Sequence, residues 1–237
     1  MCSSDLAKAM GFNLARKHVK VEDARWYAWC DRLGLLVAQD FPSSHDLGTP
    51  RARAGFAAET AEIVEQLRGH PCVVAWICFN EDWGEPPPEF QREVVRRTRA
   101  ADPTRLVVDA SGWTQRGDTD LVDVHDYRDD LSAHASGELP LWLGECGGVS
   151  LTLGRADDFA YRRVASGDEL GAEYARLVGQ LGDVAGFVWT QLADVEGELN
   201  GLLTADRVPK LASDVVRGVN ERASMRHTSS YRSANGP

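Results

Sequence analysis

Two glutamates each follow a short apolar run with the length and composition of a buried strand. Glu81 comes shortly after residues 72–79, and Glu145 shortly after residues 139–143. In parallel α/β folds the carboxyl ends of strands carry the chemistry, so both carboxylates would stand where a substrate can reach them. The competing interpretation of Glu81 is an acid that caps a strand or helix at a solvent-exposed edge.

A pair of carboxylates on either side of one bond is what glycoside hydrolysis needs, because one donates a proton and the other acts as nucleophile or base. Asn80 stands beside the first acid, and Gly144 and Gly147 flank the second. The glycines would let substrate and neighbouring backbone approach closely. The pattern therefore indicates hydrolysis of a glycosidic bond.

Several motifs in order resemble the catalytic barrel of glycoside hydrolase family 2, the family of β-galactosidases and β-glucuronidases. They lie at residues 11–16, 26–37, 70–81, 144–145, 189–191 and 200–210. The resemblance covers residues 7–222. It implies a retaining β-glycosidase that works by double displacement, with Glu81 as general acid/base and Glu145 as nucleophile.

The resemblance and the strand-end positions also suggest residues that bind the substrate. The expected set is Asn80, Arg16, Tyr127, His125, Trp189, Asp40 and Trp83. Asn80 would hydrogen-bond the sugar 2-hydroxyl, Tyr127 would donate to Glu145, and Trp189 would form a platform under the sugar. The alternatives are a surface salt bridge for Arg16, a loop cap for Asp40, a rim position for Tyr127 and barrel-mouth packing for Trp189.

Seven runs read as buried strands. They begin at Phe12, Leu35, Val73, Leu106, Leu121, Leu141 and Val184. A closed (β/α)8 barrel has eight strands. Because the opening residues 1–6 resemble translated adaptor sequence, we expect an α/β TIM barrel that lacks its first strand. The open doubly wound sheet is less favoured, since the chain has no glycine-rich phosphate-binding motif.

The expected organisation is a non-native start at residues 1–6, a partial barrel domain at 7–222 and a flexible tail at 223–237. Helices are expected at residues 24–33, 50–68, 89–101, 168–181 and 209–222. The short polar segment 128–137 should be irregular.

Composition excludes some classes of partner. The chain has 237 residues with 26 Lys and Arg against 36 Asp and Glu, a net charge of −10, which argues against nucleic-acid or anionic-membrane binding. No apolar run approaches the ~20 residues of a membrane-spanning helix, and no signal peptide opens the chain. Because we expect the natural start to be missing, the sequence does not fix the location; the cytoplasm is slightly favoured, and secretion is the alternative.

The chain has five cysteines, and their spacing is not that of a metal site. We expect them to be reduced thiols. We expect no metal or cofactor. The expected partners are a carbohydrate substrate and the amino-terminal β-sandwich domains of a longer parent chain; a homo-oligomer is also compatible with the sequence. The 237-residue chain alone should be inactive. The alternative function is a non-catalytic carbohydrate-binding barrel, or an inactive fragment of such an enzyme.

The segment after the last strand bears on specificity. Glucuronidases of the resembling family carry an Asn-x-Lys pair there, whereas this chain has Glu198-Leu199-Asn200. An acid at that place would repel the carboxylate of a uronate. A neutral sugar such as a β-galactoside is therefore expected.

Overall fold

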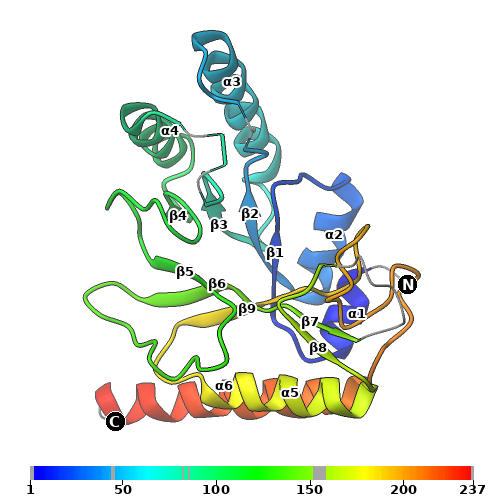
Figure 1. Cartoon of the computed structure of the whole chain (residues 1–237). Helices are drawn as coiled ribbons and strands as arrows, with labels where there is room; N and C mark the ends of the chain where they lie inside the picture. The colour runs from blue at the N-terminus through cyan, green and yellow to red at the C-terminus, as the bar shows by residue number, and fades with distance from the viewer. Residues whose placement is uncertain (1–2, 44–45, 82, 85, 152–158, 236–237) are drawn as a thin grey trace. The chain divides into compact units, whose positions relative to one another are not determined.

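The computed structural model describes residues 3–43, 46–81, 83–84, 86–151 and 159–235 (Figure 1). The chain divides into two compact units, and each is described by itself. The sheet unit comprises residues 13–125 and 137–144. The helical unit comprises residues 1–12, 126–136 and 145–237, as far as they are described.

The sheet unit is built on a parallel four-stranded sheet. Its strands, in spatial order, are β1 (Leu14–Lys17), β2 (Leu36–Asp40), β3 (Val73–Ile77) and β4 (Leu106–Val108). In register, Leu14 lies opposite Leu36, and Ala75 lies opposite both Ala38 and Leu106. Neighbours in sequence are thus neighbours in space, as in the β/α repeat of a barrel.

Three helices connect these strands. They are α2 (Ala24–Leu33), α3 (Pro50–Leu67) and α4 (Pro88–Ala101) (Figure 1). The Thr49 side chain accepts the Ala52 N–H and caps α3, a contact that contributes about 1 kcal/mol in comparable helices. α2 ends at Gly34, whose φ of 64° is the left-handed conformation that glycine adopts without strain.

The core of the sheet unit is aromatic. Trp76 of β3 is fully buried, stacks on Phe41 and donates its indole N–H to Asp102. Phe79 packs between Phe56 of α3 and Phe90 of α4. These contacts fix the end of β3, the strand that leads to Glu81.

Two further strands pass from the sheet unit into the helical unit, namely β5 (Val122–Asp126) and β6 (Leu141–Gly147). Within the sheet unit the Val122 N–H donates to the Pro140 carbonyl at 2.8 Å, which places the starts of these strands side by side. Their ends carry His125 and Glu145, so both strands deliver polar side chains at their carboxyl ends.

The helical unit contains α1 (Ser3–Ala9), α5 (Gly167–Gln180), α6 (Ser213–Asn235) and β9 (Gly186–Thr190). Helices α5 and α6 lie side by side (Figure 1). Buried Tyr174 of α5 donates to Asn220 of α6 at 2.6 Å, and Asn220 donates to the Met10 carbonyl at 3.0 Å. One polar chain therefore ties both helices to the end of α1.

The sequence-based outline agrees with these elements. Each of the seven expected strands is present and begins within two residues of its expected start, and residues 128–137 contain no helix. Two differences stand out. The short parallel pair β7 (Val149–Leu151) and β8 (Arg162–Val164) was not expected, and the last helix begins at Ser213 and continues to Asn235 instead of ending at Arg222.

Four cysteines are buried free thiols, as expected: Cys30, Cys72, Cys78 and Cys146. Cys2 and residues 236–237 of the expected tail lie outside the described residues. Among the described helices, none combines the length and the apolar character that a membrane crossing requires.

Candidate active site

Glu81 follows β3 in the sheet unit and is held at both its backbone and its side chain. Its N–H donates to the Ser111 carbonyl at 2.7 Å, and its Oε1 lies 2.8 Å from His125 Nδ1. Its φ of 50° is unusual for a residue other than glycine, and such backbone conformations concentrate at functional sites. The local structure thus fixes the direction in which this carboxylate points.

A buried ion pair lies behind Asn80. Arg16 of β1 binds Asp40 of β2 through two hydrogen bonds of 3.0 and 2.8 Å, and both side chains are at most 2% exposed. Burial opposes ionisation of Asp40, yet the charge of Arg16 holds the pKa of this carboxyl below its usual value. Sequence reasoning expected both residues to contact the substrate. In the structure both side chains are buried in their mutual ion pair, and Arg16 contacts Asn80, so the pair supports the site from behind.

Arg16 also orients the Asn80 amide. Its Nη2 donates to Asn80 Oδ1 at 2.7 Å, which fixes the amide oxygen toward the arginine. The opposite atom, Asn80 Nδ2, is buried and has no hydrogen-bond partner among the described residues. A buried donor without a partner costs about 1–3 kcal/mol, so this N–H pair is available for a ligand.

His125 contacts Glu81, whereas the sequence suggested a substrate-binding residue. Its side chain is fully buried, and its Nε2 lies 2.7 Å from Ser111 Oγ and 3.2 Å from Arg16 Nη1. Gly112, with φ of 87°, makes room for this contact, because a Cβ there would lie 3.0 Å from His125 Nδ1. Sequence reasoning missed Ser111 and Gly112. The signal was present, since a polar residue and a glycine follow an apolar strand there as well.

Trp83 lies close to the loop after β1. Its ring meets the His18 imidazole edge to face, with centroids 5.3 Å apart, and it is partly exposed. Substrate binding by Trp83 stays a prediction.

Asp123 of β5 is a buried carboxylate that sequence reasoning also missed. Both its oxygens lack hydrogen-bond partners among the described residues, and its Oδ1 would lie 2.0 Å from a Cβ on Gly144. Burial raises the pKa of Asp123 to about 6, and the charge of Arg16 only partly opposes this shift.

This shift predicts a pH-dependent stability. Because the folded-state pKa lies above that of the unfolded chain, the contribution of Asp123 is fully present below pH ~4 and is lost as the pH rises through about 6. Ionised Asp123 then costs roughly 2–3 kcal/mol. Asp123→Asn should flatten the dependence of the unfolding free energy on pH between 4 and 8, measured by urea denaturation. The same substitution at exposed Asp118 is the control, and equal slopes for both variants would contradict the prediction.

Glu145 lies in the helical unit, on β6, and accepts a hydrogen bond from Tyr127. The distance from Tyr127 Oη to Glu145 Oε2 is 2.5 Å, and the same hydroxyl lies 3.2 Å from Thr190 Oγ1 at the end of β9. Burial, together with the negative charge of Glu145, raises the pKa of Tyr127 well above its usual value. The phenol therefore stays protonated and donates to the carboxylate, as the resemblance implied.

A second tyrosine covers the first. The ring of Tyr161 stacks on Tyr127 with centroids 3.8 Å apart and planes inclined by 6°. Gly148 permits this stack, because a Cβ at this position would lie 2.5 Å from Tyr161 and 2.9 Å from Tyr127. Tyr161 lies just before β8, one of the two unexpected strands, so no strand-end pattern marked it.

Trp189 of β9 is less exposed to solvent than an aromatic ring that stacks on a sugar would be. Only 5% of the residue is exposed, and its ring packs on Tyr174 and on the backbone of Gly147. The alternative of barrel-mouth packing describes these contacts better. Its indole N–H, however, has no partner among the described residues, so hydrogen bonding to a ligand stays open to it.

One other group of side chains has the composition of a metal site. Asp31, His70 and Cys72 of the sheet unit can bring ligand atoms within 4.8 Å of one another. Asp31 already accepts the Cys72 N–H and lies 2.6 Å from His70 Nδ1, and burial raises the pKa of the Cys72 thiol far above its usual value. These contacts tie α2 to the start of β3.

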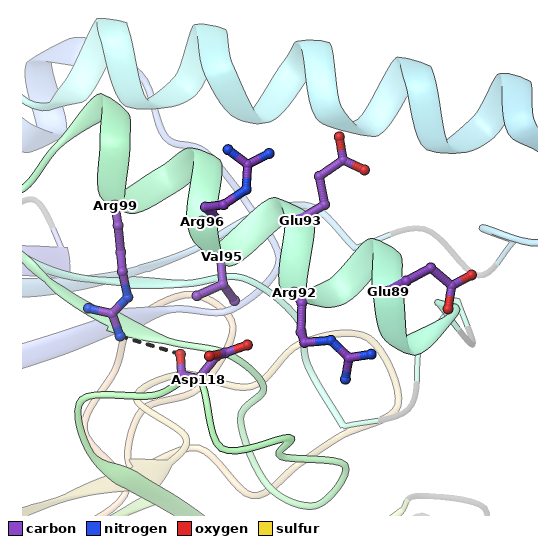
Figure 2. Close-up of a pocket in the computed structure, with 7 residues that line it drawn as sticks. All are labelled: Glu89, Arg92, Glu93, Val95, Arg96, Arg99 and Asp118. Carbon is purple, nitrogen blue, oxygen red and sulfur yellow. Dashed lines mark hydrogen bonds between the residues drawn. The ribbon is translucent and has the colours of Figure 1, made fainter.

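A surface hollow on α4 is unrelated to these groups (Figure 2). It is lined by Glu89, Arg92, Glu93, Val95, Arg96, Arg99 and Asp118. Arg99 donates to the Asp118 carbonyl there, and the lining is mostly charged helix surface. None of the residues expected to act on a substrate lies in it.

Residues 3–132, more than half of the chain, match the family described as glycosyl hydrolases family 2, TIM barrel domain. The chain belongs to glycosyl hydrolase family 2. It is 28% identical over 125 residues to a β-galactosidase of Klebsiella pneumoniae, an alignment that covers 49% of this chain and 12% of that protein. The chain thus spans a small part of this curated relative.

Solved structures share the fold. A β-galacturonidase from Eisenbergiella tayi has a TM-score of 0.75 at 17% identity over 93% of this chain and 47% of its own. A β-glucuronidase from an uncultured Clostridium species has a TM-score of 0.68 at 18% identity, with coverages of 93% and 46%. The expected α/β TIM-barrel class is confirmed. At these identities the likeness concerns the fold alone.

Proposed function

We propose that this family 2 chain is the catalytic part of a retaining β-glycosidase, with Glu145 as nucleophile and Glu81 as general acid/base. The observation that carries the proposal is the hydrogen bond from protonated Tyr127 to Glu145. A nucleophilic carboxylate must be ionised, and a neutral donor stabilises that form. Glu81 would protonate the leaving oxygen in the first step and activate water in the second.

Asn80 supports the same proposal. Because Arg16 holds the amide oxygen, the free Nδ2 can donate only to a ligand, and a sugar 2-hydroxyl next to the acid/base is the natural acceptor. Such a bond strengthens as the oxocarbenium-like transition state forms. The retaining mechanism also requires the two carboxyl groups about 5–5.5 Å apart, so that no water fits between them.

The mechanism can be tested by trapping its covalent intermediate. In a 2-deoxy-2-fluoro β-glycoside with a good leaving group, both steps are slowed, the second more than the first. The second step therefore becomes rate-limiting, and the covalent intermediate accumulates. Incubation with the longest natural protein that contains this chain should add one glycosyl group on the peptide that carries Glu145, seen by mass spectrometry. Labelling of another carboxylate, or an inverted first-formed anomer by NMR, would overturn the assignment.

We further propose that the sugar is neutral, with β-galactosides favoured. Glu198 is exposed and accepts a hydrogen bond from Gln191. Lys210, a lysine of the segment that follows, is already paired with Asp194 at 2.5 Å. The loop therefore offers a uronate an acid and no free lysine among these residues. The name of the K. pneumoniae relative agrees with a galactoside, whereas the names of the two structural neighbours point to uronates.

A panel of nitrophenyl β-glycosides decides between these sugars. We expect kcat/KM for the galactoside to exceed that for the glucuronide by roughly fivefold, the discrimination that about 1 kcal/mol of repulsion from an exposed charge gives. Glu198→Gln should narrow the gap, and Glu196→Gln, an exposed acid in the same loop, is the matched control. A preference of the natural protein for the glucuronide would contradict the proposal.

A further inference from the structure

The contacts of His125 determine which of its nitrogens carries the proton. Its Nε2 lies 3.2 Å from Nη1 of Arg16. A guanidinium can only donate, so Nε2 must accept and carries no proton. The Ser111 hydroxyl, 2.7 Å from the same nitrogen, can turn its hydrogen toward Nε2 as well. A neutral imidazole with a bare Nε2 has its hydrogen on Nδ1.

That hydrogen points at Glu81. His125 Nδ1 lies 2.8 Å from Glu81 Oε1, so the imidazole is the donor and the carboxylate oxygen the acceptor. Behind the histidine, Arg16 is itself fixed by its two bonds to Asp40. Side-chain contacts therefore connect Asp40 to Arg16, Arg16 to His125, and His125 to Glu81. All four residues belong to the sheet unit.

We propose that His125 is a positioning residue for Glu81: as the neutral Nδ1–H tautomer it holds Oε1 and leaves proton transfer to Oε2. The tautomer follows from the contacts alone, while the consequence for catalysis rests on the proposed function of Glu81. A donor at Oε1 favours the carboxylate form, so it helps Glu81 release its proton to the leaving group in the first step.

The other charged and titratable groups around His125 come from three places. Arg16 faces it from β1, Glu81 from the end of β3, and Asp123 from β5 with Oδ1 3.9 Å from Nε2. The Trp113 ring meets the imidazole edge to face at 6.0 Å and adds no charge.

The tautomer can be observed without turnover. In a long-range ¹H–¹⁵N spectrum of the 237-residue chain at pH 7, His125 should show a protonated Nδ1 and an unprotonated Nε2. The His125→Gln spectrum, which lacks these signals, provides the assignment. An Nε2–H tautomer or an imidazolium would overturn the proposal. The expected tautomer in this chain, together with inactivity of the longest natural protein that contains it, would count against the proposed function and leave the position of His125 intact.

Two isosteric variants test the catalytic consequence in the longest natural protein. The amide nitrogen of Asn can replace Nδ1–H and keep the bond to Glu81, whereas the amide of Gln reaches the place of Nε2 and leaves Oε1 without its donor. His125→Gln should therefore move the basic limb of kcat/KM upward by about one pH unit. In His125→Asn the basic limb of kcat/KM should lie within a few tenths of a pH unit of its position in the unsubstituted protein.

Leaving-group dependence gives the second readout. The loss in His125→Gln should be largest for alkyl glycosides, which need proton donation, and small for dinitrophenyl glycosides, which do not. Thermal melting of both variants checks that they fold. Equal pH profiles for well-folded Asn and Gln variants, or equal losses on both classes of substrate, would show a purely structural role and overturn the proposal.

Discussion

We expect Glu145→Ala to lower the turnover of β-glycosides by several orders of magnitude, and added azide to restore part of it. The reason is that the substitution removes the group that attacks the anomeric carbon and leaves a space that a small anion can fill. Tyr127 then keeps its hydroxyl directed into that space, because the stack with Tyr161 still holds its ring. The measurement is the steady-state rate with and without azide, in the longest natural protein that contains this chain.

The product identifies the step that azide replaces. Azide acting in place of Glu145 attacks from the nucleophile's side and gives the α-glycosyl azide from a β-glycoside. Glu145→Gln is the matched control, since its amide fills the space and should prevent the recovery. A loss within roughly tenfold, or recovery that yields the β-glycosyl azide, would contradict the role of Glu145.

Glu81→Ala has the second-largest expected effect, and its size depends on the leaving group. Alkyl glycosides should lose roughly 10²- to 10⁴-fold in kcat/KM, the usual contribution of general acid catalysis. Dinitrophenyl glycosides should lose much less in kcat/KM, because their leaving group departs without a proton. Their kcat should still fall, since Glu81 also activates the water that completes the second step.

The anomer of the azide product separates the two glutamates. With Glu81→Ala, azide attacks the covalent intermediate and gives the β-glycosyl azide. Glu81→Gln preserves the size of the side chain and its contact with His125 Nδ1–H, so any difference from the Ala variant reports on that contact. Equal losses of kcat/KM on activated and unactivated glycosides for both glutamate variants would show that the roles are wrongly assigned.

These two experiments also probe a difference between the surroundings of the two acids. Glu145 accepts from a tyrosine whose pKa lies far above neutral, whereas Glu81 accepts from an imidazole nitrogen. Both donors are neutral, so each supports a carboxylate without supplying a charge. The donor on Glu81 is the one supported from behind by a buried arginine.

The sequence by itself determined the order and type of the elements. An apolar strand or an amphipathic helix is a local pattern, so the seven strands and the helices α2 to α5 could be located from residue periodicity. The two glutamates were found from the same kind of local pattern, because each comes at or shortly after the end of an apolar run. Tyr127 was indicated by the resemblance to family 2. The end of the last helix was not found from the sequence, since the polar residues 223–235 carry no clear signal that ends a helix.

Only the tertiary structure decided which side chains contact one another. Arg16 and Asp40 looked like substrate contacts because both lie at strand ends. Parallel pairing of β1 and β2 sets Arg16 opposite Ala38, two residues before Asp40, and the two charged side chains meet and neutralise each other in a buried site. His125 was expected to contact the substrate. Its imidazole contacts Glu81 instead, because the glycine at position 112 leaves space for the ring. Sequence spacing does not encode such long-range contacts, because they depend on the register of strands that are far apart along the chain.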